Sequence, residues 1–502
     1  MLMKLPQSVR NLTSVIGASI ALISLLIILF LFVVSAIFDI GSSYLGIFIY
    51  IALPMVLVVG LILIPVGVLK EKKRLKKHPE EAGAKDWPVI DFNQPAVRNA
   101  TIIFVAGTIC FLILSAIGSY EAFHLTESDE FCGKLCHQVM EPEYTAYQQS
   151  AHERVGCVEC HVGSGAGWYV KSKLSGLYQV YSVIFNKYPK PIPTPIHSLR
   201  PARETCEECH WTEKFYARKI NTKRSYLADE STSEWDIHLM MKTSATYSAQ
   251  GLQEGIHWHI NPDIKIEYRA ADEGRHSIPW VRYTNLKTGE VKIYEDRSID
   301  TEGVDLETIE MRTMDCMDCH NRPSHNYQSP ANFVDDYITS GAISHELPDI
   351  KVVAMDALST DYATVDSAMN GIEAYAREYY EIMYPEVLTE KKELYDQAME
   401  AIKTGYKKNI FPEMKVNWTV YPNHLGHLET DGCYRCHNDK HETATGEIIS
   451  RDCNLCHDIL AQGTAGQLAY GTTENPLEFK HPVDINEQWR TTFCSECHFS
   501  LY

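Results

Sequence analysis

Basic residues are scarce in this chain of 502 residues, where 46 Lys and Arg stand against 65 Asp and Glu and give a formal net charge of −19. No basic tract occurs outside one short loop, which argues against nucleic acid as a partner. Apolar residues make up 45% of the sequence, which excludes a disordered chain. Fifteen cysteines are too many for an ordinary cytosolic enzyme, and their ordered spacing does not fit a secreted disulfide scaffold. The cysteine count therefore points to the attachment of a cofactor.

Charge is absent from three long apolar stretches near the N-terminus, residues 15–37, 45–69 and 100–120. Each reaches the ~20 residues that a helix needs to cross a bilayer, and the first is too long for the core of a cleaved signal peptide. The sequence therefore predicts a membrane anchor of three transmembrane helices over residues 1–121. Lys and Arg are concentrated between the second and third stretches, which predicts a cytoplasmic N-terminus and a periplasmic chain after Glu121. The basic loop could also contact lipid headgroups or a partner.

Seven cysteine pairs follow the third stretch, and each pair is closed by a histidine. The first pair has three residues between its cysteines and the others have two. The fifteenth cysteine, Cys110, lies inside the third stretch and is interpreted as an apolar filler. The motifs are Cys132–Cys136–His137, Cys157–Cys160–His161, Cys206–Cys209–His210, Cys316–Cys319–His320, Cys433–Cys436–His437, Cys453–Cys456–His457 and Cys494–Cys497–His498.

A C-x-x-C-H motif is the attachment signal for c-type haem. Two thiols reach the vinyl groups on one porphyrin edge, and the adjacent histidine supplies the proximal nitrogen to the iron. A single C-x-x-C pair could instead bind zinc or form a redox disulfide. Seven pairs, each followed by histidine, predict a cytochrome with seven covalently bound c-type haems. Because the macrocycles supply much of the apolar core, we expect a mainly α multihaem fold with low regular secondary structure.

The soluble part is predicted to contain three regions. A tetrahaem domain covers residues 122–345 and includes a small β-rich insertion at 211–315. Within the insertion, residues 256–260 and 264–268 alternate like strands, and residues 280–283 and 291–294 form a hairpin. A helical spacer follows at 346–420, with helices at 364–380 and 389–408, and a trihaem domain closes the chain at 421–502.

The residues around the first four motifs carry a family resemblance. Met140 follows the first motif, His152 lies five residues before Cys157, Lys173 lies twelve residues after His161, and His325 lies five residues after His320. These features resemble the NapC/NirT/NrfH family of membrane-anchored quinol dehydrogenases, over roughly residues 100–210 and 310–330. Seven haems and three spans go beyond the four haems and one span usual in that family. The whole layout is most similar to its seven-haem ImcH group of inner-membrane cytochromes.

The resemblance implies a set of axial ligands for the first four haems. Haem 2 would be held by His161 and His325, haem 4 by His320 and His152, and haem 3 by His210 with Lys173. Haem 1 would be held by Met140 or His137, with an open distal side where a quinol could give up electrons. At the position where the NrfH branch has an acidic residue near this site, the nearest residue here is Gln179. We therefore expect Met140, Lys173 and Gln179 at the quinol site.

Other histidines are candidate distal ligands for the remaining haems. His441, His481 and one of His424 and His427 are predicted to serve the last three motifs. His257 and His259 alternate on a predicted strand and would point to opposite faces. One of them, taken here as His257, could replace Lys173 as a ligand, and the other would support packing.

The function that the resemblance implies is the oxidation of menaquinol at the periplasmic face of the bacterial inner membrane. Electrons would pass through the haems to periplasmic multihaem cytochromes, in anaerobic or extracellular metal respiration. Two alternatives stay open: an electron-transfer subunit of a larger quinone-linked complex, and a terminal multihaem reductase of a nitrogen oxyanion or a metal. The expected partners are the membrane quinol pool and periplasmic cytochromes, with a homo-oligomer left open.

Overall fold

The computed structural model describes residues 11–38, 53–77, 92–134, 137–163, 166–196, 200–247, 251, 254–299, 306 and 308–499. The loop at 39–44, part of the basic loop including Lys85, and Cys136 of the first motif lie outside these ranges. The chain divides into two compact units, residues 1–128 with 157–180 and residues 129–156 with 181–502. The first unit holds the apolar stretches and the second motif, and the second unit holds the other motifs.

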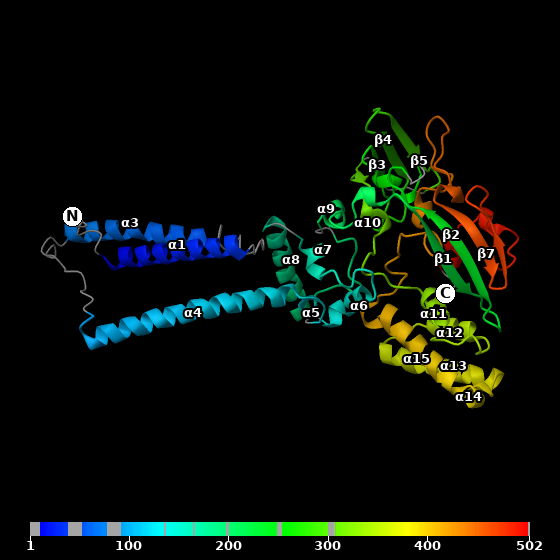
Figure 1. Ribbon diagram of the computed structural model, residues 1–502, viewed down its shortest axis with the longest axis horizontal. Helices are drawn as coiled ribbons and strands as arrows, with labels where there is room; N and C mark the ends of the chain where they lie inside the picture. Colours follow the sequence, from blue (N-terminus) through cyan, green and yellow to red (C-terminus); the bar gives the residue numbers. More distant parts are fainter. Residues whose placement is uncertain are drawn as a thin grey trace. The chain divides into compact units, whose positions relative to one another are not determined.

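Long apolar helices make up most of the first unit. α1 spans Leu12–Phe38 and α3 spans Leu53–Lys77, and each contains a segment long and apolar enough to cross a membrane. The two helices pack side by side (Figure 1), and a Cβ added at Gly17 would lie 2.7 Å from the carbonyl oxygen of Gly60. Because both positions lack a side chain, the two backbones can approach closely, as in membrane helix pairs.

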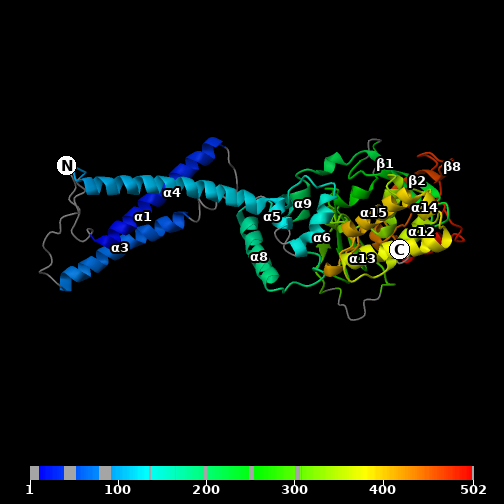
Figure 2. The ribbon, with the colours of Figure 1, turned by 90° about the horizontal axis from the view of Figure 1, so that it is seen from below.

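The third apolar stretch lies inside α4, which spans Pro95–Glu127 and is drawn as one unbroken helix in Figure 2. Pro95 suits the first turn, where its missing N–H would have no helical partner. The 33 residues of α4 make a helix of about 50 Å, longer than the ~30 Å hydrocarbon core of a bilayer. The unit also contains α7 (Cys157–His161) and most of α8 (Ala166–Ile184).

A helical body with its own apolar core lies in the second unit. It consists of α11 (Pro330–Thr339), α12 (Ile350–Ser359), α13 (Val365–Met383), α14 (Val387–Glu390) and α15 (Lys392–Asn409). α13 begins with a capping box in which the side chains of Thr364 and Ser367 satisfy each other's backbone N–H groups. Ile372 and Tyr380 of α13 are fully buried against Tyr395 and Ile402 of α15 in one core. The two helices predicted for the spacer are therefore present, as α13 and α15.

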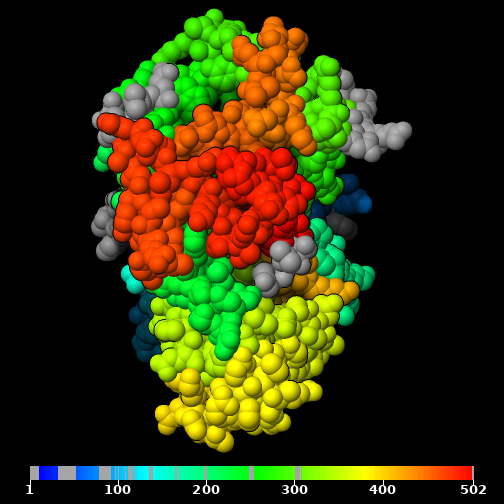
Figure 3. Space-filling view, turned by 90° about the vertical axis from the view of Figure 1, so that its right-hand side faces the viewer, coloured from blue at the N-terminus to red at the C-terminus, as the bar shows by residue number. Residues whose placement is uncertain are grey.

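Two four-stranded antiparallel sheets are described in the second unit. The first has the order β1-β2-β7-β8 and the second the order β5-β4-β3-β6. In the first sheet Met241 pairs with His457, so strands far apart in the sequence form neighbouring parts of one sheet. On the face shown in Figure 3, the orange and red C-terminal residues adjoin the green residues and lie above the yellow ones. The strands are β1 (Arg218–Tyr226), β2 (Glu234–Lys242), β3 (Ile264–Arg269), β4 (Trp280–Asn285), β5 (Val291–Glu295), β6 (Arg312–Thr313), β7 (His457–Thr464) and β8 (Gln467–Tyr470).

The predicted hairpin is confirmed, because β4 and β5 pair with Tyr283 opposite Lys292. The strand predicted at 256–260 is wrong, since Ile256–Ile260 forms the short 3-10 helix η5. Gly255, at a φ of 125°, turns the chain there, and its carbonyl accepts the N–H of Trp258. Local turn hydrogen bonds therefore replace the sheet hydrogen bonds that the alternating pattern had suggested.

Short helical turns carry the cysteine motifs of the described chain. Because residues three apart lie on the same side of a helical turn, the two thiols of a pair project in similar directions and the histidine follows at once. Each of these turns is either a 3-10 helix or an α-helix. Asp315 caps the turn of the fourth motif by accepting the N–H of Met317. These turns are α9 (Ala202–Cys206), α10 (Cys316–Cys319), η7 (Gly432–Arg435), η8 (Cys453–Leu455) and α16 (Cys494–His498), with α5 (Asp129–Lys134) and α6 (His137–Gln148) around the first motif. The other short turns are η4 (Thr212–Lys214), η6 (Pro412–Met414) and η9 (Gln488–Arg490).

Candidate haem-binding site

The attachment motifs of the second unit follow one another in space. Along motifs three to seven, a thiol of each motif lies close enough to a thiol of the next to shift its pKa. The neighbouring thiols are Cys206 with Cys316, Cys319 with Cys433, Cys433 with Cys456, and Cys453 with Cys494. Each of motifs three to six therefore has a thiol near a thiol of the motif that follows it in the sequence.

A second imidazole faces the histidine of each of these five motifs. The distances between ring centres are 6.1 Å for His152–His210, 6.3 Å for His257–His320, 5.9 Å for His259–His437, 6.2 Å for His427–His457 and 6.2 Å for His481–His498. Two imidazoles on opposite sides of one iron place their ring centres about 6 Å apart, because each metal–nitrogen bond is about 2 Å and each ring centre lies about 1 Å beyond its nitrogen. The five pairs therefore fit the axial positions of five haem irons.

Hydrogen bonds to Nδ1 orient several of these rings. The Nδ1 of His257 lies 2.7 Å from the carbonyl oxygen of Thr243, and the Nδ1 of His259 lies 2.9 Å from that of Ile256. The Nδ1 atoms of His152 and His437 likewise contact backbone carbonyls. A carbonyl partner requires Nδ1 to carry the proton, which leaves the lone pair of Nε2 for a metal. The rings are therefore held in the tautomer that binds iron through Nε2.

Burial lowers the pKa of seven of the ten paired rings and so favours the neutral form, which is the form that coordinates a metal. Burial, together with the neighbouring His259, lowers the pKa of His437 to about 4. Burial, together with the neighbouring His457, also lowers the pKa of His427 to about 4. The Nδ1 atoms of His427 and His457 are buried without a hydrogen-bond partner among the described residues.

The structure brings together different partners from those implied by the family resemblance. His152 lies beside His210, and not beside His320 as that pairing scheme required. His257 takes the place opposite His320, with the two ring planes only 7° apart. Lys173 belongs to the first unit, where its Nζ contacts Glu127 Oε1 at 2.6 Å, whereas the ring opposite His210 is that of His152.

Three further predicted residues, His424, His427 and His441, differ in their surroundings. His427 faces a motif histidine, as one of the predicted alternatives required, but His441 does not. His441 is fully buried, and its Nδ1 and Nε2 contact Asn438 Oδ1 at 3.0 Å and the Ile278 carbonyl at 2.7 Å. Each ring nitrogen of His441 thus faces an oxygen atom of the protein, and neither faces a motif histidine. His424 is buried, and the ring that it faces is not that of a motif histidine.

His259, which had been interpreted as a packing residue, occupies the place predicted for His441. The two histidines of the Ile256–Ile260 turn face His320 and His437, in different motifs, so both are paired. The sequence indicates that each motif needs one distal ligand. It does not indicate which of the histidines outside the motifs serves which haem.

The second and first motifs are described less completely. His161 ends α7 in the first unit, and His325 lies in the second unit with its Nδ1 2.9 Å from the Glu143 carbonyl oxygen. In the first motif Cys136 and the side chain of His137 lie outside the described residues, and Met140 is partly buried on α6.

An ion pair between a lysine and a carboxylate lies in the first unit, and α8 carries a stripe of exposed apolar side chains. Glu127 ends α4, and its side chain is 12% exposed where it meets Lys173 of α8. Gln179 is exposed on the same helix and contacts Ser175 Oγ at 3.5 Å. Large apolar side chains are exposed along one side of α8, at Val170, Leu174, Leu177, Tyr181 and Ile184. Glu127 was not predicted from the sequence, because nothing in its spacing links it to Lys173.

Comparisons with known proteins identify the family of this chain. The model of the NapC/NirT cytochrome c family, N-terminal region, matches residues 94–192. The chain is 42% identical over 493 residues to the cytochrome c-type protein ImcH of Geobacter sulfurreducens, a match that covers 98% of this chain and 95% of that protein. It is 27% identical over 117 residues to the cytochrome c-type protein NrfH of Wolinella succinogenes, covering 23% of this chain and 64% of that protein. No solved structure matches the chain. The chain therefore belongs to the NapC/NirT cytochrome c family, with an ImcH-like layout, and is a membrane multihaem c-type cytochrome of electron transfer.

Proposed function

We propose that this protein oxidises menaquinol at the periplasmic face of the inner membrane and passes the electrons through seven c-type haems to periplasmic multihaem cytochromes. The observation that carries the proposal is the series of five imidazole pairs, each 5.9–6.3 Å between ring centres, on motifs that follow one another in space. An iron with two imidazole ligands has no vacancy for a substrate, so such haems suit the relay of electrons. The paired rings therefore favour a relay over a terminal reductase at these five sites.

In this proposal the axial ligands follow the observed ring pairs. His152 serves haem 3, His257 haem 4, His259 haem 5, His427 haem 6 and His481 haem 7. The proposal keeps His161 with His325 for haem 2, and Met140 or His137 for haem 1, as the family resemblance implies. The haem chemistry supplied is one-electron transfer, with potentials set by ligand type, burial and hydrogen bonding around each ring.

The quinol is proposed to react beside the pair formed by Lys173 and Glu127. Glu127 lies seven residues beyond the apolar stretch that ends at Tyr120, or about 10 Å along the helix, and five residues before Cys132. A carboxylate at that depth suits a proton acceptor for a quinol whose tail stays in the bilayer. Oxidation of menaquinol to menaquinone releases two electrons, one at a time, and two protons to the periplasm. Glu127 thus offers the carboxylate that Gln179 cannot supply.

The apolar stripe of α8 supports a membrane-facing site. Its residues recur at helical spacing, and Leu174, Leu177 and Ile184 are 64%, 69% and 70% exposed. A helix with such a stripe lies in the membrane interface with its apolar side against the acyl chains. We accordingly propose three spans, with α4 as the third, a cytoplasmic N-terminus and a periplasmic haem domain. The proposed domains are residues 1–121, 122–345 with the insertion 211–315, 346–420 and 421–502.

Stopped-flow reduction of the purified holoprotein in detergent tests this function. A menaquinol analogue should reduce the haems, and Lys173→Leu and Met140→Leu should slow that reduction while dithionite still reduces every haem. Lys171→Leu, an exposed lysine two residues away on α8, is the matched control and should react like the unmodified protein. Unchanged quinol turnover in both site variants would remove the site assignment. Protein that accepts electrons from dithionite but never from the quinol would instead be an electron-transfer subunit of a larger complex.

A further inference from the structure

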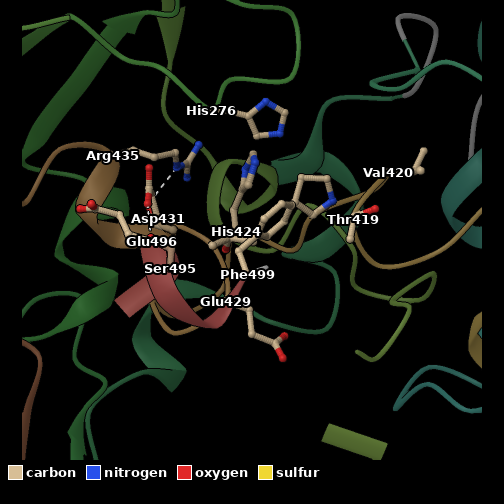
Figure 4. A pocket seen from close by; sticks show the side chains of 13 residues that line it. His276, Thr419, Val420, His424, Glu429, Asp431, Arg435, Ser495, Glu496 and Phe499 are labelled. Atoms are coloured by element: carbon tan, nitrogen blue, oxygen red, sulfur yellow. Dashed lines mark hydrogen bonds between the residues drawn. The ribbon is translucent and has the colours of Figure 1, made fainter. Parts of the chain in front are cut away.

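A cavity of about 410 Å³ lies between the fifth and seventh motifs of the second unit (Figure 4). Asp431 and Gly432 of its wall come directly before Cys433, and Ser495 and Glu496 lie between Cys494 and Cys497. Two histidines, His276 and His424, also line it, and neither faces a motif histidine. Neither of these two histidines is among the proposed haem ligands.

His424 has an unusual environment for a polar side chain. It is only 3% exposed, and neither ring nitrogen makes a hydrogen bond of ordinary geometry with any residue that the structure describes. Leaving a buried polar group unpaired costs about 1–3 kcal/mol, so such a group in a native protein indicates a missing partner. A neutral imidazole has one nitrogen lone pair that can bind a metal, and the ring of His424 lines the cavity.

His276 faces His424 across the cavity from a fixed position. The two ring centres are 5.5 Å apart and the ring planes are nearly perpendicular, at 88°. The Nδ1 of His276 lies 3.0 Å from Asp272 Oδ1, and the same carboxylate accepts the backbone N–H groups of His276 and Ser277. A carboxylate on Nδ1 sets the tautomer and orients Nε2, as it does for histidines that bind metals.

The separation of this pair differs from that of the proposed haem ligands. With metal–nitrogen bonds of about 2 Å, each ring centre lies about 3 Å from the metal, and a 5.5 Å separation corresponds to an angle of about 130° at the metal. A trans pair on one haem would require about 180° and a separation of about 6 Å. The geometry therefore fits a tetrahedral or trigonal ion better than a haem iron.

We propose that His276 and His424 bind a divalent first-row transition-metal ion, with Asp272 as the positioning residue for His276. Imidazole nitrogens suit zinc, copper, nickel and iron. The carboxylates of the wall have other partners: Asp431 accepts from Ser495, Glu429 from Ser329 and Asn332, and Glu496 from the backbone of Phe493. Water in the cavity would therefore complete the coordination.

Zinc binding to the complete, tag-free holoprotein tests the site. After removal of adventitious metal with a chelator, equilibrium dialysis against Zn²⁺ with elemental analysis gives the zinc bound per chain, and zinc-edge X-ray absorption gives the number of imidazole ligands. We expect one zinc with two imidazoles. His276→Gln and His424→Gln should each abolish this binding, and Asp272→Asn should weaken it about 10- to 100-fold.

His345→Gln, at an exposed histidine outside the cavity, is the matched control and should bind zinc normally. The haem content and the reduced spectrum of each variant establish that it has folded. Zinc that is absent, that binds without two imidazoles, or that stays bound in the His276 and His424 variants would overturn the proposal.

Discussion

The choice between His259 and His441 as the distal ligand of haem 5 can be decided with two matched alanine variants. His259 lies 5.9 Å from His437 between ring centres, with its Nδ1 on the carbonyl of Ile256. His259→Ala removes one imidazole from one iron and leaves a cavity that water can enter. A ferric haem with one imidazole and water is high-spin, so we expect one haem in seven, about 14% of the ferric haem, to change from low to high spin.

Electron paramagnetic resonance of the oxidised protein measures this change by integrating the high-spin ferric signal against total haem. Added imidazole should enter the cavity and restore the low-spin state, which a general loss of structure would not allow. The size of the signal is itself a test, because a change in more than one haem would mean that the substitution disturbs neighbouring sites.

His441→Ala is the control, and it should behave in the opposite way. It removes the imidazole that contacts the Ile278 carbonyl, and a buried acceptor left unpaired costs about 1–3 kcal/mol. The free energy of unfolding should fall while the spin state stays unchanged. A high-spin signal in His441→Ala together with none in His259→Ala would refute the assignment and restore the ligand predicted from the sequence.

Three further predictions concern the other parts of the protein. Glu127→Gln should slow reduction by a menaquinol analogue by about 10²-fold in stopped-flow measurements, because it removes the proposed proton acceptor beside Lys173, and equal rates in variant and unmodified protein would contradict that role. Ile372→Ala, in the fully buried core of α13, should lower the free energy of unfolding by about 2–5 kcal/mol in a denaturant titration and leave the haem spectrum unchanged. Lys351→Met should cost about 3–5 kcal/mol because it strands the buried Asp335 carboxylate, and adding Asp335→Leu should recover most of that loss; a double variant no more stable than the single one would exclude this explanation.

The family could be recognised from the sequence because its signals are local. Each cysteine pair and its histidine lie within six residues, and the apolar stretches are continuous. The full-length similarity to ImcH confirms that recognition. The helices α13 and α15 were likewise predictable, since the composition of each, and the capping box of α13, are encoded within the segment.

The ligand pairs could not be read from the sequence because their members are far apart in it. His257 and His320 are 320 − 257 = 63 positions apart, and His259 and His437 are 437 − 259 = 178 apart. Alternation around His257 and His259 suggested a strand, whereas Gly255 turns the chain into a 3-10 helix that directs the two rings to different motifs. The ion pair of Lys173 with Glu127 has the same origin, since only tertiary packing joins α8 to the end of α4.

The pairing of β2 with β7 has a consequence for biogenesis. β7 begins at His457, so an edge of β2 that is left open during synthesis is covered only after more than two hundred further residues have been made. An uncovered strand edge invites association with other chains. His457 therefore belongs both to the strand that covers this edge and to the sixth attachment motif. Attachment of haem and closure of the sheet would then be linked, and a chain short of haem would be more prone to aggregate.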